Sequence, residues 1–302
     1  MSQFDGTYNK FLSKWAIDDH FDSCETYKKN LSPDEKVNIY CEDIKKFNLE
    51  SLEQIDMLTF GFPCNDFSLV GEKLGFKGKY GPLYSYGVKI LKLLSPKCFI
   101  AENVSGLSSS NEGKAFEKIK KDLVESGYKI HTQKFKLEEY GIPQSRHRII
   151  IIGFRNDLKI NYIPPEPTYE IITSKEALDG MSKDLPNNEF TRQSKQVIER
   201  LKFIKPGQNA WSKDIPDDLK LNVKGAKLSN IYKRLDPDKP SYTVTGSGGG
   251  GTHMYHWKEN RALTNRERAR LQTFPDTFIF SGNKESVRRQ IGMAIPPKLE
   301  KF

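Results

Sequence analysis

The sequence predicts an α/β protein that has an open sheet in its first half and a less regular region after it. Short apolar runs alternate with amphipathic segments up to about residue 154, periodicity is weak from Asn156 to about Lys227, and order returns from Asn230. Alternation of strands and helices is typical of open α/β sheets. In such sheets the functional residues lie in loops beyond the carboxyl ends of the strands.

The elements of the first half follow from the spacing of apolar residues. Apolar runs predict strands over residues 55–60, 98–101, 128–137 and 148–153, and the last contains four consecutive isoleucines. Apolar positions that share one helical face predict helices over residues 83–94 and 116–123. Gly127 is expected to end the second of these helices, because glycine favours that position.

The last seventy residues carry three further signals. Residues 241–245 alternate like a strand and are followed by the glycine run 246–251. Thr264 and Glu267 have the spacing of a capping box, which predicts a helix that starts there and continues through Leu271. We therefore expect one domain over residues 1–158, a smaller and irregular domain over 159–229, and a return to the first domain over 230–302.

Composition and charge limit which classes of protein and which kinds of site are possible. The chain has 302 residues, a hydrophobic content of 36% and a formal net charge of +9, which favours a polyanionic partner without identifying one. It contains neither a long apolar run nor a signal-like N-terminus, so we expect a cytoplasmic protein. The four cysteines form no CxxC pair and have no histidines at metal-ligand spacing, so neither a metal site nor a disulfide framework is expected.

Three segments contain residues suited to chemistry. Cys64 follows a predicted strand in a Gly-Phe-Pro-Cys loop, where a thiolate can act as a nucleophile, although a cysteine there can also simply fill the strand end. Glu102 follows the next strand, where partial burial would raise its pKa and suit it to proton donation; a surface loop is the alternative. Gln144, Arg146 and Arg148 alternate in an extended segment and could bind phosphate or a base, or form a solvated strand edge.

Taken in order, these segments resemble the motif series of the DNA cytosine-C5 methyltransferases. The resemblance runs from about Trp15 to Pro297 and rests on five segments: Pro-Cys at 63–64, Glu-Asn-Val at 102–104, Gln-x-Arg-x-Arg at 144–148, Arg234 with Pro-Ser-Tyr-Thr-Val-Thr at 240–245, and Gly-Met-Ala-Ile-Pro-Pro at 292–297. Leu-Thr-Asn-Arg-Glu at 263–267 and Arg-Leu-Gln at 270–272 also fit this pattern. It implies a Rossmann-like sheet that uses S-adenosylmethionine, with a smaller and irregular target-recognition domain.

The resemblance implies a covalent mechanism on double-stranded DNA. The Cys64 thiolate would attack C6 of a flipped-out cytosine while Glu102 hydrogen-bonds or protonates N3, and C5 would then take the methyl group. Arg148 and Arg146 would hold the base or a neighbouring phosphate. A restriction-modification or phage system in a bacterium is the expected setting.

The resemblance also implies binding residues. Asp18 would accept hydrogen bonds from the ribose hydroxyls, with Asp19 as the alternative if the register slips by one, and Asp43 would face the adenine amino group. Pro63 and Leu83 would line the adenine pocket. DNA contacts are expected from Ser68, Gln144, Arg234, Thr243 and Thr245. The target sequence cannot be read from the chain, because base contacts depend on individual side chains.

Two departures from the family pattern leave alternatives open. The first strand and glycine loop of the family are not found before Asp18, and only five residues follow Pro297. A truncated gene product is the preferred explanation, followed by a split enzyme whose partner subunit supplies the strand, and by a degenerate relative. The alternative function is therefore a non-catalytic DNA-binding subunit. Asn65 and Met293 also replace the usual Gln and Asn, without removing a proton-transfer group.

Overall fold

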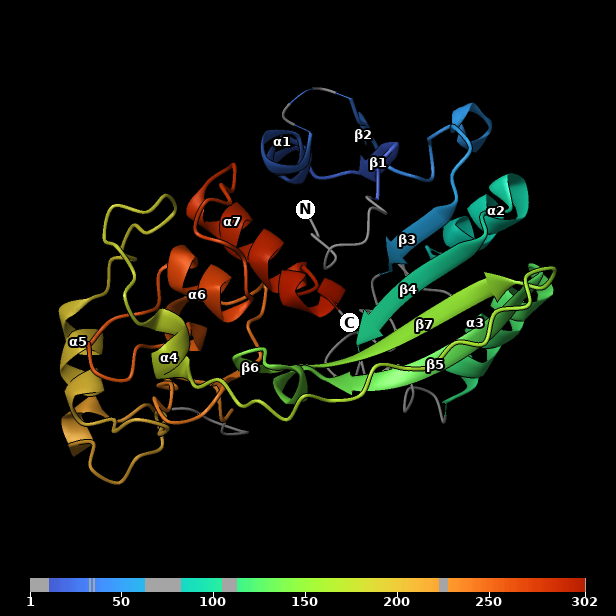
Figure 1. Cartoon of the computed structure of the whole chain (residues 1–302). Coiled ribbons are helices and arrows are strands. Elements are labelled where there is room, and N and C mark those ends of the chain that lie inside the picture. The colour runs from blue at the N-terminus through green and yellow to red at the C-terminus, as the bar shows by residue number, and fades with distance from the viewer. Residues whose placement is uncertain are drawn as a thin grey trace.

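The fold is built on a mixed sheet whose parallel strands end beside the predicted catalytic loops. A computed structural model of the chain describes residues 11–32, 34, 36–62, 83–104, 113–222 and 228–301. Its main sheet has the strand order β3-β4-β7-β5, made of β3 (Met57–Gly61), β4 (Cys98–Val104), β7 (His147–Arg155) and β5 (Tyr128–Lys136) (Figure 1). Strands β3 and β4 are parallel, whereas β7 is antiparallel to both of its neighbours.

The two faces of this sheet carry different apolar clusters, because alternate residues of a strand point to opposite sides. On one face Phe99, Ala101 and Ile151 pack with the helices α2 (Tyr84–Leu94) and α3 (Lys114–Glu125). On the other face, residues 100, 150 and 152 pack around the short helix η4 (Leu137–Tyr140). The predicted strands and helices of the first half are confirmed, but β4 extends three residues beyond the predicted 98–101 and therefore contains Glu102, which was expected in a loop. Gly127 has a φ of 99° directly after α3 and ends that helix as predicted.

A smaller parallel pair precedes the main sheet. Strands β1 (Trp15–Asp18) and β2 (Asn38–Cys41) pair in register and are connected by helix α1 (Phe21–Leu31). Within the described ranges, this pair shares no ladder with β3. Helix α1 contacts the C-terminal region, because the Thr26 hydroxyl donates to Oε1 of Gln290 over 2.6 Å.

The second half contains short helices and long irregular stretches. Helices α4 (Ser174–Leu178) and α5 (Lys195–Lys202) lie in the predicted recognition region, and α6 (Asn265–Leu271) and α7 (Lys284–Met293) follow the glycine run. The remaining single-turn helices are η1 (Leu49–Ser51), η5 (Asp217–Leu219), η6 (Gly250–Thr252) and η7 (Pro297–Lys301). The predicted capping box is confirmed, with the Thr264 hydroxyl accepting from the Glu267 N–H and the Glu267 carboxylate accepting from the Thr264 N–H.

One predicted strand is shorter than expected. Only Ser241–Tyr242 forms a strand, β8, which pairs in parallel with β6 (Gln144–Ser145). Beyond it side chains replace the ladder, since the Val244 N–H donates to the Gln144 side chain and the Thr243 hydroxyl donates to the Ser145 carbonyl. The alternation over 241–245 therefore reflects packing rather than a full strand.

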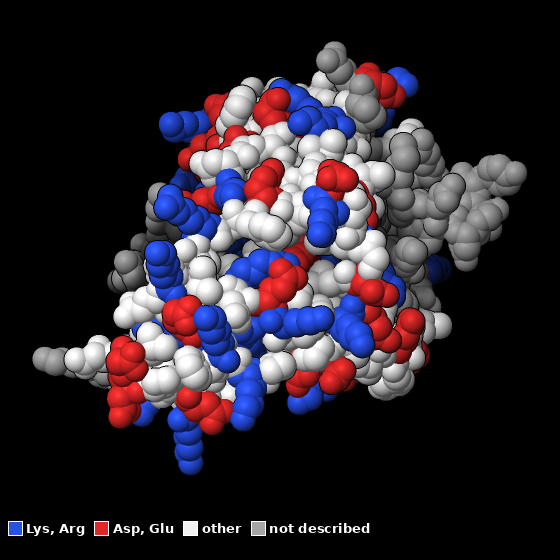
Figure 2. Space-filling model, turned by 90° about the vertical axis from the view of Figure 1, so that its left-hand side faces the viewer, with Lys and Arg blue, Asp and Glu red and all other residues white. Residues whose placement is uncertain are grey.

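The outer surface of the recognition region carries both signs of charge. Figure 2 shows basic side chains interleaved with acidic ones over the face that contains α5, without a continuous basic patch. Ion pairs account for part of this mixture, including Lys202 with Glu199 and Lys205 with Asp214. The net positive charge of the chain is therefore not concentrated on this face. No helix among the described residues is both long enough and apolar enough to cross a bilayer.

Candidate active site

Glu102 lies beside the strand that leads to Cys64. Strands β3 and β4 run in parallel, and Gly61, the last residue of β3, is the register partner of Glu102. A Cβ atom at Gly61 would lie 3.5 Å from Oε2 of Glu102, so the carboxylate lies against the end of β3. The Asn103 side-chain amide donates to the Phe62 carbonyl over 2.9 Å and fixes the point where the chain leaves the sheet. The parallel pairing thus brings the two predicted loops to one edge.

The Glu102 carboxylate forms a largely buried ion pair with Arg148. Nε of Arg148 lies 2.6 Å from Oε1 of Glu102, and the two side chains are only 11% and 14% exposed. Burial raises the pKa of Glu102 above its ordinary value, while the charges of Arg148 and Arg146 partly offset that rise. The predicted direction of this pKa shift is confirmed. A carboxyl group in this state is suited to hold a proton next to a fixed cation.

Arg146 has a structural role that sequence spacing did not indicate. Its side chain is 1% exposed, and the guanidinium donates to the carbonyls of Val244, Gly292 and Ala294 at 2.9, 2.8 and 3.1 Å. Direct contact between Arg146 and a base or phosphate would require these bonds to break, so that prediction is corrected. Arg146 instead joins the segment that follows β8 to the end of α7.

Gln144 is likewise internal, and the predicted DNA contact is wrong for this conformation. Its side chain is 0% exposed; its amide group donates to Oε1 of Gln272 and to the Leu271 carbonyl, and its carbonyl oxygen accepts from the Val244 N–H. The Gln272 amide in turn donates to the Ile291 carbonyl over 2.6 Å. Sequence reasoning gave Gln272 no role. Its only signal was its place in the Arg-Leu-Gln segment of the resemblance.

Arg234 is also a buried connector rather than an exposed DNA contact. Its guanidinium donates to the carbonyls of Leu201, His256 and Glu259 and to the Asn260 side chain, and the residue is 3% exposed. Its predicted DNA contact is corrected for the same reason as that of Arg146.

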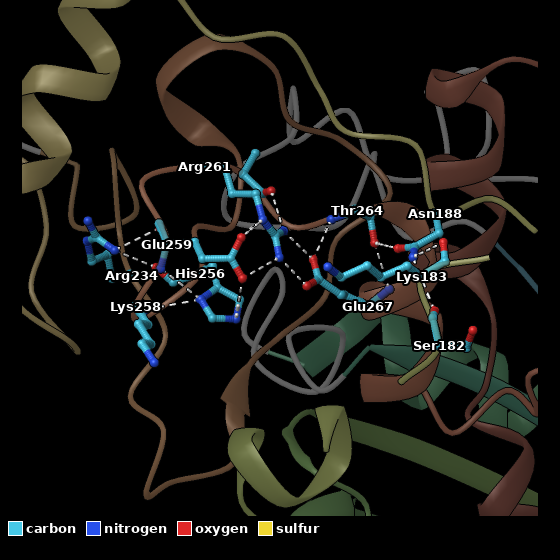
Figure 3. A network of polar contacts seen from close by, with 11 residues as sticks. Ser182, Lys183, Asn188, Arg234, His256, Lys258, Glu259, Arg261, Thr264 and Glu267 are labelled. Carbon is cyan, nitrogen blue, oxygen red and sulfur yellow. Dashed lines mark hydrogen bonds and ion pairs between the residues drawn. The ribbon is translucent and has the colours of Figure 1, made fainter. Parts of the chain in front are cut away.

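The network of polar contacts around Arg234 continues into α6. In Figure 3, Arg261 lies between Glu259 and Glu267, and both carboxylates accept from its guanidinium at 2.7 Å. The recognition region is therefore connected to the helix that carries the capping box through the buried Arg234 and Glu267, the half-buried Arg261 and the exposed Glu259.

Thr243 and Thr245 lie at the edge of the same assembly. Thr243 is half-buried and Thr245 is exposed, and the Thr245 hydroxyl donates to the Ser247 carbonyl over 3.0 Å. Their contact with DNA remains a prediction. Ser68, Pro63 and Cys64 lie outside the described residues.

The predicted cofactor residues lie at the ends of the smaller strand pair. Asp18 ends β1, keeps exposed surface and accepts from the His20 N–H over 2.8 Å. Desolvation by the surrounding protein raises the pKa of its carboxyl group, and the charge of Asp19 adds to that rise. Asp43 follows β2 and accepts from the Lys45 N–H, and Leu83 directly precedes α2. Contact of these residues with a cofactor remains a prediction.

Comparisons with known proteins agree with this geometry. The profile of the family described as C-5 cytosine-specific DNA methylase matches residues 6–302. The Type II methyltransferase M.BbvI of Brevibacillus brevis is 56% identical over 301 residues, which cover 97% of this chain and 80% of that protein. The Type II methyltransferase M.NgoFVII of Neisseria gonorrhoeae is 39% identical, over 94% of this chain and 77% of that protein.

Solved structures show the same fold at low sequence identity. A protein encoded within a prophage of E. coli superposes with a TM-score of 0.67 at 22% identity, and covers 95% of this chain and 89% of its own. The S. pombe Dnmt2 methyltransferase superposes with a TM-score of 0.62 at 17% identity, over 95% and 87% of the two chains. With the profile match and the identity to M.BbvI, these findings show that the chain belongs to the C-5 cytosine-specific DNA methylase family.

Proposed function

We propose that this protein transfers a methyl group from S-adenosyl-L-methionine to C5 of cytosine within a specific double-stranded DNA sequence. The observation that carries the proposal is the buried ion pair of Glu102 and Arg148 beside the end of β3, the strand that leads to Cys64. Relatives named as Type II methyltransferases support a role in restriction-modification. Such a role places the reaction in the bacterial cytoplasm, where the DNA is.

The residues at the strand ends fit the proposed methyl donor. Among the described residues Asp18 accepts one hydrogen bond, from the His20 N–H, and a carboxylate has room for about four. Asp18 therefore retains acceptor capacity for ribose hydroxyls, and the carboxyl ends of parallel strands are where this class of sheet binds nucleotide-like ligands. When bound, S-adenosylmethionine would supply an electrophilic methyl group.

In the proposed reaction the protein activates the ring of the substrate. C6 of cytosine is a poor electrophile, so Glu102 protonates or hydrogen-bonds N3 while the Cys64 thiolate adds to C6. Arg148 keeps the carboxyl group in place and presents positive charge to the base. Electron density then reaches C5, which would take the methyl group as its bond to sulfur breaks and leave S-adenosylhomocysteine. Loss of the C5 proton to a base and release of the Cys64 thiolate restore the ring. Since C6 is inaccessible within a duplex, the cytosine must flip out first.

The reach of the chain is compatible with this arrangement. Only Pro63 separates Phe62 from Cys64, so the chain allows at most about 7 Å between the Cα atoms of these two residues, and Asn103 holds the Phe62 carbonyl beside Glu102. Since a pyrimidine ring is a few ångströms across, the two groups can act on the same base.

Methyl transfer to duplex DNA tests the proposal. The purified chain is incubated with DNA and methyl-labelled S-adenosylmethionine, and the digested nucleosides are separated. We expect 5-methyldeoxycytidine as the labelled product, and none from Cys64→Ser. A label on an exocyclic amino group would refute the proposed chemistry. Salt-sensitive DNA binding without any labelled product would instead favour the non-catalytic DNA-binding subunit.

A further inference from the structure

Two arginines near the glycine loop, residues 246–251, have charges that the described acidic side chains offset only in part. Arg268 on α6 is 2% exposed, and its Nη2 has no acceptor among the described residues. Arg288 on α7 is half-buried, and within the same ranges its Nε also lacks an acceptor. The two guanidiniums are close enough for Arg288 to lower the pKa of Arg268, after burial as the main cause. Both are therefore held close together, against their mutual repulsion.

The neighbouring groups do not neutralise this pair. Nη1 of Arg288 lies 3.1 Å from Nδ1 of His253, and burial beside the two arginines lowers the pKa of that histidine to about 4, so the ring is neutral and accepts. Glu267, the acid next in sequence to Arg268, accepts from Arg261 with both oxygens and from the Thr264 N–H. Its charge is thus already matched by that of Arg261.

Burial raises the pKa of Tyr242 and Tyr255, so their hydroxyl groups stay neutral and do not balance the charge of Arg268. Tyr242 donates to the Lys233 carbonyl over 3.0 Å, and Tyr255 donates to the Gly250 carbonyl over 2.9 Å. A buried guanidinium without an acceptor is costly to maintain. An anion that enters beside Arg288 would remove that cost, whereas a purely structural role would call for an acceptor such as those around Arg146.

The position of the pair points to the anion. The glycine loop, residues 246–251, packs directly on α7, since a Cβ at Gly292 would lie 2.0 Å from the Gly246 nitrogen. Gly249 and Gly250 are exposed at the tip of this loop, and the hydrogen bond from Tyr255 to Gly250 holds that tip near His253. Thr245, at the start of the loop, is one of the predicted DNA contacts. Glycine backbone and arginine together form a common phosphate-binding arrangement.

We propose that Arg288, supported by Arg268 and His253, binds a backbone phosphate of the DNA next to the glycine loop. The inference rests on the proposed function, because DNA supplies the phosphate. Arg288 makes the contact and Arg268 provides positive charge from behind it. His253 positions Arg288 through Nδ1 without adding charge.

The salt dependence of DNA binding tests this site without requiring catalysis. The full chain and Arg288→Gln are titrated with a short duplex over a range of potassium chloride concentrations. Loss of one phosphate contact reduces the slope of log K against log salt by about 0.9 and lowers affinity about eightfold at 0.1 M salt. Lys121→Gln, which removes one exposed charge from α3, is the control and keeps the wild-type slope. An unchanged slope in Arg288→Gln overturns the proposal.

A second variant separates this site from a structural role. Arg268→Met removes a buried charge that lacks an acceptor, so its melting temperature should rise while its DNA affinity falls. A fall in melting temperature with unchanged DNA affinity would show that Arg268 is structural and overturn its assigned role. Inorganic phosphate is the further probe. If phosphate stabilises the wild type but not Arg288→Gln, and the DNA slope is equal in both, the site takes a free anion and the DNA assignment is wrong.

Failure of this site and failure of the proposed function remain distinguishable. If the enzyme is active and Arg288→Gln leaves the slope of log K against log salt unchanged, only the proposed phosphate site is contradicted. A chain that forms no 5-methylcytosine, but whose slope falls in Arg288→Gln, contradicts the catalytic proposal and supports the site.

Discussion

Replacing Arg146 distinguishes a structural connector from a DNA contact. In Arg146→Met the carbonyls of Val244, Gly292 and Ala294 lose the donor that Arg146 supplies, while the Ala294 carbonyl keeps a hydrogen bond from the Gln272 amide. Three hydrogen bonds from a charged donor are worth about 1.5 kcal/mol each, or about 4 to 5 kcal/mol together. Removing a desolvated guanidinium offsets part of this loss, so we expect the free energy of unfolding to fall by about 3 kcal/mol.

That loss is measurable by calorimetry and by urea titration. For a chain of this size we expect the melting temperature to fall by roughly 6 to 12 °C. The slope of DNA affinity against salt should stay at its wild-type value, because the side chain is 1% exposed. A melting temperature within 2 °C of wild type (roughly the error of the assay), together with a reduced slope, would restore the DNA contact and refute the structural role.

Three further predictions concern catalysis, close packing and pH. Glu102→Gln should lower kcat about 100-fold or more in the methyl-transfer assay while DNA affinity is retained; unchanged kcat would exclude Glu102 as the acid. Gly292→Ala should lower the free energy of unfolding by roughly 1 to 3 kcal/mol, since its Cβ would meet the Gly246 nitrogen at 2.0 Å, whereas Gly249→Ala, with nothing within 4 Å, is the neutral control. Burial lowers the pKa of His253 to about 4 in the folded protein. At pH values below the ordinary histidine pKa of about 6.5, the unfolded chain therefore binds more protons than the folded one, and the free energy of unfolding should fall as the pH drops from about 6.5 to 4. His253→Asn should flatten that urea-denaturation profile, and an equal slope in both proteins would contradict the assignment.

Local signals predicted the framework and the main acid. The alternation of apolar runs and helical faces gave the strands around Glu102, because periodicity depends on residues a few positions apart. The capping box at Thr264 followed from a spacing of three residues. The raised pKa of Glu102 was expected because it follows an apolar run, although Glu102 lies within β4 and not beyond it. Each of these features is set by neighbours in the chain.

The roles of the polar connectors could not be predicted, because their partners are distant in sequence. Arg146 binds carbonyls about one hundred and one hundred and fifty positions away, and the spacing Gln-x-Arg-x-Arg contains no trace of those acceptors. The same holds for Gln144 and Gln272, which meet only after β6 and α6 come together. An arginine in a basic chain that resembles a DNA enzyme was therefore assigned to DNA by default. The burial of the Arg146 side chain leaves almost no surface for contact with DNA.

Covalent trapping is the most direct test of whether Cys64 and Glu102 act on the same flipped cytosine. Replacing the C5 hydrogen of the target with fluorine prevents the final elimination, so the thiol stays attached to C6. With S-adenosylmethionine present, we expect a denaturation-resistant complex whose DNA-linked peptide carries the modification at Cys64. Cys64→Ala should form none. An adduct at another residue, or methyl transfer to ordinary DNA without any adduct on the fluorinated duplex, would contradict attack of Cys64 on C6.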